Sequence, residues 1–159
     1  MSGAQPSALV FEPLQEEHLD AVMAIEKEAY PEPWTRGMFL QDMDTPLARF
    51  YVAFIEGVLV GYVGIWRVAD EAHMTSVTVR RDYRRQGLGS ELVRFILHVS
   101  ADLGLRRAFL EVRESNVAGQ RLYRKLGFQH TGWRKGYYRS TGEDAVVMSK
   151  TIDPAGETC

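Results

Sequence analysis

Residues 84–90 carry the clearest chemical signal in the chain. They follow a strand-like run at 74–79 and open a helix-like run at 91–103. Two glycines allow a tight turn and a close approach of the backbone to a ligand, and a helix start offers unpaired N–H groups at the positive end of its dipole. Such a segment predicts an anion site, most often for phosphate, with arginines at its rim that suit phosphate geometry. Its residues are Arg84, Arg85, Gln86, Gly87, Leu88, Gly89 and Ser90.

Two familiar phosphate motifs are excluded at this segment. A P-loop would place a lysine with serine or threonine directly after the glycines, and none follows. The dinucleotide fingerprint would have a third glycine where Leu92 stands. The alternative without function is a loop with ordinary glycines and surface arginines.

Length and composition indicate one soluble globular domain. The chain has 159 residues, 45% hydrophobic and 25% charged, and this suits a single core. We expect a disordered tail at 1–7, one domain at 8–152 and a C-terminal tail at 153–159. No run of 18 apolar residues could span a membrane, and residues 1–7 lack the basic and apolar regions of a signal peptide.

Cysteine and histidine usage argues against disulfides and metal. The only cysteine is Cys159, so the sequence has no internal disulfide framework and no cysteine zinc site. The four histidines are scattered without metal-ligand spacing. We therefore expect a cytoplasmic protein without a metal.

Charge is distributed unevenly along the chain. The net charge is −2, but residues 1–49 carry three basic and nine acidic side chains, and residues 67–139 carry fifteen basic and seven acidic ones. A basic centre fits a phosphate-bearing cofactor or nucleic acid. A solvated surface would account for many of the same arginines.

The hydrophobic pattern predicts the elements that must position these groups. We expect helices at 16–30, 35–42, 91–103 and 116–126, with Thr35 as an N-cap and Gly104 as a C-cap. Strands are predicted at 9–12, 49–55, 58–68, 73–79, 107–112, 128–133 and 144–152. A strand meander followed by strand–helix units predicts an α/β fold, with a mixed sheet of about seven strands and about four helices on both faces.

This order of elements resembles the GCN5-related N-acetyltransferase (GNAT) superfamily over about residues 8–152. The motifs that carry the resemblance are Val77-Thr78-Val79 with the glycine segment, Leu110 to Asn116 (LEVRESN), Leu122 to Phe128 (LYRKLGF), and Pro33-Trp34-Thr35 with Tyr137-Tyr138 and Glu143-Asp144-Ala145. The second and fourth are similar to the ribosomal-protein-alanine N-acetyltransferase branch. Residues 80–83 depart from the aspartate-proline pair of many relatives.

The resemblance implies acetyl-CoA as co-substrate. The glycine segment would hold the pyrophosphate, the backbones of Val77, Thr78 and Val79 would pair with the pantetheine arm like an added strand, and Asn116 would hydrogen-bond that arm. One of the strand N–H groups would also donate to the oxyanion. Asn116 can serve as an N-cap for its helix at the same time.

The resemblance also implies two catalytic groups. Glu111 would act as general base, and Tyr123 would protonate the departing thiolate. Tyr123 lies seven residues after Asn116, which places both on one helix face. The structural alternatives are a salt bridge from Glu111 to Arg113 or to another neighbour, and a core aromatic at Tyr123 packed on Phe128.

The branch implies a protein acceptor, namely the N-terminal alanine of a small-subunit ribosomal protein. Trp34, Tyr137 and Tyr138 would flank its groove, although Trp34 can equally close the core. Direct contact with nucleic acid or a membrane is not needed. Two other functions stay open, which are acetylation of a small amine or a protein lysine, and a non-catalytic acyl-CoA-binding or RNA-associated module. The presence of both Glu111 and Tyr123 argues against the module.

Overall fold

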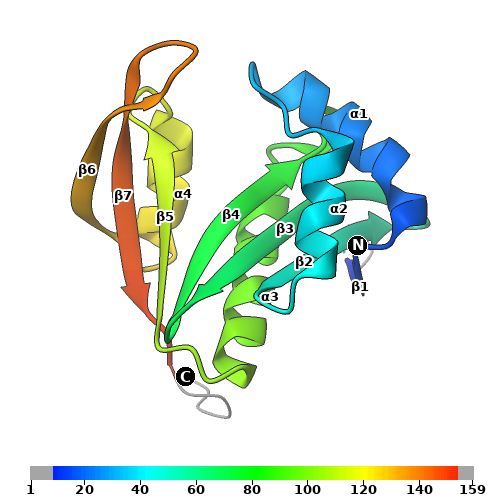
Figure 1. Ribbon diagram of the computed structural model, residues 1–159, viewed down its shortest axis with the longest axis horizontal. Coiled ribbons are helices and arrows are strands. Elements are labelled where there is room, and N and C mark those ends of the chain that lie inside the picture. Colours follow the sequence, from blue (N-terminus) through cyan, green and yellow to red (C-terminus); the bar gives the residue numbers. More distant parts are fainter. Residues whose placement is uncertain (1–8, 154–159) are drawn as a thin grey trace, which may run out of the picture.

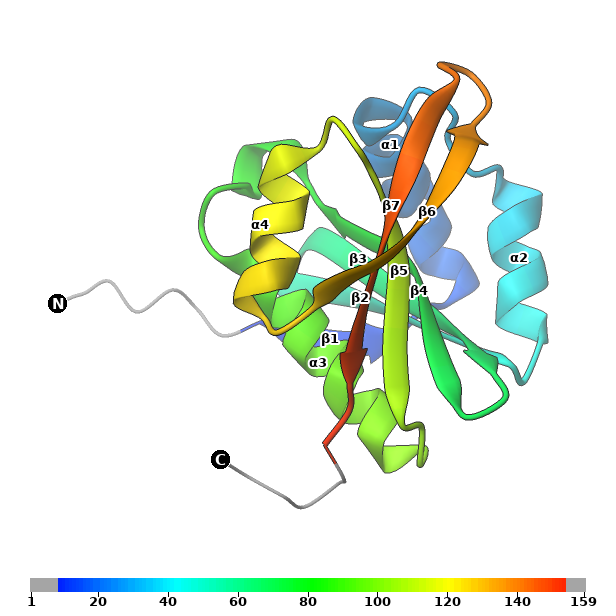
Figure 2. The same ribbon diagram turned by 90° about the vertical axis from the view of Figure 1, so that its left-hand side faces the viewer.

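The computed structural model describes residues 9–153, which fold into a mixed seven-stranded sheet with four α-helices (Figures 1 and 2). The predicted α/β class is therefore confirmed. The tail predicted at 1–7 and the residue Cys159 lie outside the described range. The strands are β1 (Val10–Pro13), β2 (Ala48–Ile55), β3 (Val58–Val68), β4 (Glu71–Val79), β5 (Arg107–Arg113), β6 (Gln129–Tyr138) and β7 (Glu143–Thr151). The helices are α1 (Leu19–Ala29), α2 (Arg36–Asp44), α3 (Leu88–Asp102) and α4 (Val117–Lys125), with 3-10 turns at Glu16–His18 and Arg81–Tyr83.

The sheet consists of two antiparallel parts joined by one short parallel pairing. Its order is β1-β2-β3-β4-β5-β7-β6. Strands β4 and β5 pair in parallel at only three positions, of which His73 with Phe109 is the last. Beyond this point the two strands diverge, as Figure 1 shows. The β5-facing edge of β4 is consequently left without a strand partner from Met74 onward.

A β-bulge marks the same point of β4. In the pairing with β3, Ser76 lies opposite Gly64 and Met74 lies opposite Ile65, so Thr75 is the extra residue. Its Oγ1 is buried and has no hydrogen-bond partner among the described residues. A bulge bends its strand and increases its twist, which explains why β4 turns away from β5 here.

Two hydrophobic cores hold the sheet from opposite faces (Figure 2). Helices α1 and α2 bury Leu19, Val22 and Phe39 against one face. Helix α3 buries Leu92 and Ile96 against the other face, where α4 also packs. Helices therefore cover both faces of the sheet that contains the fork between β4 and β5.

Most predicted elements are confirmed, but the predicted start of α3 was wrong. The helix begins at Leu88 rather than at residue 91, because Gly87 takes the left-handed conformation (φ +81°) that caps it. Leu88, Gly89 and Ser90 therefore form the first turn. The prediction for β6 ended at 133, whereas the strand continues irregularly to Tyr138. Gly104 (φ +80°) ends α3 as predicted.

Candidate active site

A cavity of about 470 Å³ occupies the fork between β4 and β5. Five parts of the chain line it, namely α1 with the segment that follows it, β4, β5, α4 with its N-cap, and β6. Seven of the predicted site residues meet there, which are Trp34, Val77, Glu111, Asn116, Tyr123, Tyr137 and Tyr138. Residues far apart in the sequence thus share one site.

Glu111 lies at the wall of this cavity, with its side chain only 6% exposed. Its Oε1 is 2.7 Å from Nε2 of His73, the residue at the point where β4 and β5 separate. Its Oε2 lies 3.2 Å from Nε of Arg134 on β6 but makes no hydrogen bond with any described residue. The alternative of a salt bridge is wrong for Arg113, which pairs with Glu143, but it is confirmed for other neighbours, since Glu111 pairs with His73 and Arg134.

The environment keeps Glu111 ionised. Burial by itself raises the pKa of this carboxyl, but the hydrogen bond to His73 and the positive charges of His73 and Arg134 together lower the pKa below its ordinary value. Since a carboxylate with a low pKa is a weak base, it can accept a proton only from a nitrogen that has itself become acidic.

Tyr123 projects from α4 into the same cavity. Its ring meets Phe128 edge to face at 5.8 Å, so the core-aromatic alternative is also correct. Burial, followed by the neighbouring phenols of Tyr30 and Tyr138, raises the pKa of Tyr123 well above its ordinary value. The hydroxyl therefore stays protonated at neutral pH and can act as a proton donor.

Asn116 caps α4, as predicted. Its Oδ1 accepts a hydrogen bond of 2.8 Å from the Gly119 N–H. The side chain also lines the cavity, so the two roles considered for Asn116 are compatible.

The segment after α1 is fixed by a buried carboxylate. Glu26 is 4% exposed and accepts hydrogen bonds from the Trp34 N–H (2.9 Å) and from the Tyr62 hydroxyl (2.5 Å). Trp34 packs against Phe39 at 5.1 Å while also lining the cavity. Both interpretations of Trp34 therefore hold, and Glu26 sets the position of its backbone.

The opposite wall comes from the end of β6. Tyr137 and Tyr138 stand edge to face at 5.0 Å, and Arg113 lies 4.0 Å from the Tyr138 ring centre in a cation–π contact. Tyr137 is 43% exposed. Aromatic side chains of this kind offer a peptide both an apolar surface and hydrogen-bonding hydroxyls.

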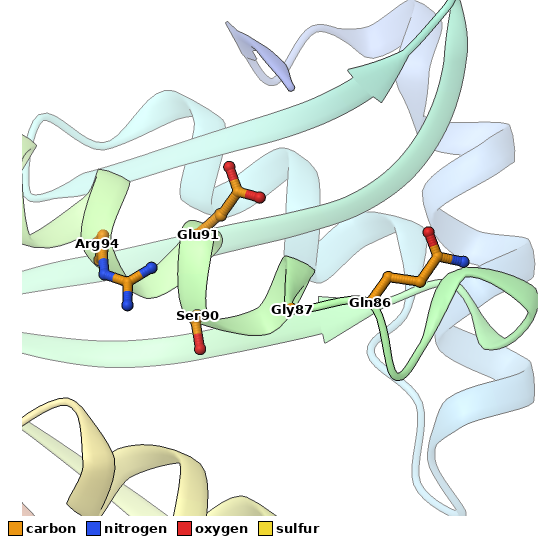
Figure 3. A pocket seen from close by; sticks show the side chains of 5 residues that line it. All are labelled: Gln86, Gly87, Ser90, Glu91 and Arg94. Atoms are coloured by element: carbon orange, nitrogen blue, oxygen red, sulfur yellow. The ribbon is translucent and has the colours of Figure 1, made fainter. Parts of the chain in front are cut away.

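The glycine segment forms a separate shallow hollow at the start of α3, shown in Figure 3. Gln86, Gly87 and Ser90 line it together with Glu91 and Arg94. Ser90 and Arg94 extend from the same side of α3, and Glu91 points away from them (Figure 3). The unpaired N–H groups of the first helical turn and the exposed Arg94 suit an anionic ligand.

The other residues predicted for the cofactor occupy different surroundings. Leu88 is buried in the core, so only its backbone can serve a ligand. Gly89 packs closely on α4, because a Cβ there would lie 3.3 Å from Leu122. Arg85 has φ +66°, a strained turn conformation for a non-glycine residue.

Two of the three strand residues predicted to bind the cofactor, Thr78 and Val79, already make hydrogen bonds within the protein. The Thr78 hydroxyl hydrogen-bonds the Tyr30 hydroxyl at 2.7 Å, on the side of α1. The Val79 carbonyl accepts a hydrogen bond from Nε of Arg84 at 3.0 Å. Val77 is the one of the three strand residues that lines the cavity.

Sequence reasoning missed His73, Arg134 and Arg94. The first two contact Glu111 only through sheet pairing, and no local motif announces them. Arg94 had a signal, since it follows Ser90 by four residues and so shares its helix face. Across the described residues no group of three His, Cys, Asp or Glu side chains could hold a metal ion.

Comparison with known proteins identifies the class. The chain matches the acetyltransferase (GNAT) family over residues 19–128 and belongs to it. It is therefore an N-acetyltransferase, as the sequence motifs implied. In residues 9–153 each helix falls short of the length and hydropathy that a membrane span requires.

The relatives narrow the comparison to one branch of the family. A protein of Bacillus subtilis (strain 168) is 41% identical over 138 residues, which cover 86% of this chain and 91% of the relative. The [ribosomal protein bS18]-alanine N-acetyltransferase of Escherichia coli (strain K12) is 33% identical, with coverage of 87% and 95%. The crystal structure of the ribosomal-protein-S18-alanine N-acetyltransferase from Escherichia coli superposes with a TM-score of 0.84 at 31% identity, covering 96% of this chain and 99% of that one.

Proposed function

We propose that this enzyme transfers the acetyl group of acetyl-CoA to the N-terminal α-amine of a protein. Alanine is the favoured first residue, and a small-subunit ribosomal protein is the acceptor. The observation that carries the proposal is the buried carboxylate of Glu111, held ionised at the cavity wall with Oε2 making no hydrogen bond to the described residues. The similarity to the [ribosomal protein bS18]-alanine N-acetyltransferase of Escherichia coli supports the choice of acceptor. A cytoplasmic location is part of this proposal.

The residues present fit acetyl-CoA, which when bound supplies a thioester carbonyl that an amine can attack. The N–H groups of residues 85–90 hold the pyrophosphate at the positive end of α3. The unpaired edge of β4 offers N–H and C=O groups to an extended arm beside Val77. The Asn116 side chain reaches the same cavity.

Glu111 and His73 manage the protons of the acceptor amine. A protein α-amine has a pKa of about 8, so a minority is neutral at pH 7. Attack makes the nitrogen positive and much more acidic, and at that stage the weakly basic Glu111 can take its proton. His73, hydrogen-bonded to Glu111 and 25% exposed, connects the carboxylate to solvent.

Tyr123 completes the reaction at the sulfur. The departing thiolate needs one proton, and the neutral phenol at the cavity wall can donate or share it. Tyr123 recovers a proton from solvent before the next turnover. Each turnover with a neutral amine thus moves one proton from nitrogen to sulfur.

An acceptor panel tests the proposal. The enzyme is incubated with acetyl-CoA and a peptide beginning with alanine, the same peptide with a blocked N-terminus and an internal lysine, and a set of small amines, and products are read by mass spectrometry. We expect acetylation of the free alanine peptide. Preferred acetylation of the blocked peptide would make this a lysine enzyme, preference for a small amine would overturn the protein acceptor, and no transfer would favour a non-catalytic module.

A further inference from the structure

The two oxygens of Glu111 are in different situations. Oε1 is committed to His73 at 2.7 Å. Oε2 is buried and makes no hydrogen bond of standard geometry with the described residues, and Nε of Arg134 lies 3.2 Å from it in an ion pair. The Tyr137 phenol also lies near this carboxylate, and burial, followed by the charge of Glu111, raises the pKa of Tyr137. Oε2 therefore has the lone pairs available to a proton that leaves an acceptor nitrogen, and Arg134 lies against them.

Arg134 cannot accept a proton from the acceptor nitrogen. A guanidinium has only donors and does not lose its proton in proteins. An acceptor ammonium at Oε2 would place a second positive charge beside the guanidinium, so the two cations compete for the same buried carboxylate. Arg134 is the group that can move away from Oε2, because its side chain is 53% exposed, whereas the Glu111 side chain is 6% exposed.

The backbone around Arg134 is loosely paired. The register between β6 and β7 is irregular from Arg134 to Tyr138. Gly136 there has φ +61°, and its N–H donates to the Asp144 carboxylate at 2.8 Å instead of to a strand carbonyl. Arg134 also lies 5.7 Å from the ring centre of Tyr137, which lines the cavity. A shift of the Arg134 side chain therefore also changes its contact with the Tyr137 ring.

We propose that Arg134 is a displaceable latch on Glu111, and that the cationic N-terminus of the acceptor takes its place at Oε2. This inference rests on the proposed function for the identity of the acceptor. Before the acceptor arrives, the latch keeps the buried carboxylate paired. When the acceptor ammonium binds, it inherits the ion pair, and loss of one proton to solvent yields the amine that attacks.

If Arg134 is such a latch, a mutation that removes its charge is expected to improve acceptor binding rather than impair it. Because breaking the Arg134–Glu111 pair opposes acceptor binding, Arg134→Gln lowers the acceptor KM and raises kcat/KM for the acceptor. Partly exposed ion pairs contribute little, which corresponds to about a two- to fivefold change. The KM for acetyl-CoA does not change.

The matched control is Lys135→Gln, which removes the same charge from the next residue of β6. Lys135 is exposed and has no ion pair with a described residue. Initial rates are measured for wild type and both variants with an alanine peptide at saturating acetyl-CoA. We expect the acceptor KM to fall in Arg134→Gln alone.

Three results would overturn the latch. A rise in acceptor KM in Arg134→Gln would mean that Arg134 holds the acceptor. An equal fall in both variants would mean long-range repulsion of a cationic peptide, and an unchanged KM would mean that the pair does not oppose binding. If the wild type acetylates only a small amine or a lysine, the proposed acceptor fails, and the same KM comparison with that amine still decides the role of Arg134.

Discussion

Glu111 combines burial with two positively charged or polar neighbours, and this combination decides what its carboxylate can do at neutral pH. Its lowered pKa means that it is ionised throughout the range in which an α-amine titrates. The rise of activity with pH is therefore expected to follow the amine and not Glu111. His73 and Tyr123 complement it, one beside the carboxylate and the other as a protonated phenol across the cavity.

Replacing Glu111 by glutamine tests the base. Glu111→Gln keeps the size of the side chain and removes its charge, so we expect the rate to fall by about 10²–10⁴-fold with little change in acetyl-CoA affinity. Because Glu111 takes its proton from the nitrogen after attack, the loss stays nearly constant as pH rises through the amine pKa. Rates between pH 6 and about pH 9 and calorimetric titration of acetyl-CoA provide the measurement. A loss that disappears above the amine pKa would instead mean that Glu111 acts only by deprotonating the ammonium before attack.

Replacing Tyr123 by phenylalanine isolates its hydroxyl. The ring contact with Phe128 is kept, so thermal stability changes little while the chemical step slows. Because burial raises the pKa of Tyr123, the wild type shows no loss of activity from tyrosine ionisation up to about pH 10, the ordinary titration of a phenol. Single-turnover rates and a melting curve are the readouts. Wild-type turnover with a lower melting temperature would leave Tyr123 as a core residue only.

At the scale of elements, the start of α3 forms one hollow and the fork between β4 and β5 forms the other. Gly87 places the first-turn N–H groups around one hollow, and the bulge at Thr75 moves β4 away from β5 to open the other. The first hollow is lined by residues within 86–94 and the second by β4 among other elements, and the chain runs from β4 through one 3-10 turn to the start of α3. We expect a ligand with a phosphate end and an extended arm to occupy both hollows.

A pair of glycines at the two ends of α3 tests the first hollow. Gly87 and Gly104 have nearly the same φ, +81° and +80°, and a Cβ on either would meet no atom within 4 Å. Gly87→Asp and Gly104→Asp therefore carry similar backbone strain, and the helix dipole makes Asp less favourable at Gly104. We expect acetyl-CoA binding to be abolished by Gly87→Asp and kept by Gly104→Asp in calorimetry. Equal affinities in the two variants would remove the phosphate role from this segment.

Part of this site could be predicted because its residues lie in local sequence motifs. The other residues reach the site only through strand pairing between distant parts of the chain. The glycine segment, Asn116 and Tyr123 lie within short, recognisable stretches of sequence. His73 is separated from Glu111 by 38 residues and meets it only because β4 pairs with β5. The start of α3 was misplaced for a local reason, since the left-handed conformation of Gly87, which begins the helix at Leu88, is not visible in the sequence.

At the scale of the whole molecule, charge and fold point the acceptor toward one side of the cavity. The acidic residues of the first 49 positions lie in the part of the chain that supplies α1 and α2, and Glu26 and Glu32 line the cavity. The basic central part supplies the glycine segment, α3 and α4. A negatively charged co-substrate and a positively charged protein N-terminus would thus approach complementary surfaces.

The most direct test of the account uses an intact acceptor protein. Unacetylated ribosomal protein bS18 with alanine as its first residue is incubated with the enzyme and acetyl-CoA, beside the same protein with an additional methionine before that alanine. Intact mass and fragmentation locate any acetyl group. We expect one acetyl group on the N-terminal alanine, formed at least about tenfold faster than on the methionine form and lost with Glu111→Gln. Acetylation confined to lysine side chains, or equal transfer that persists in Glu111→Gln, would contradict it.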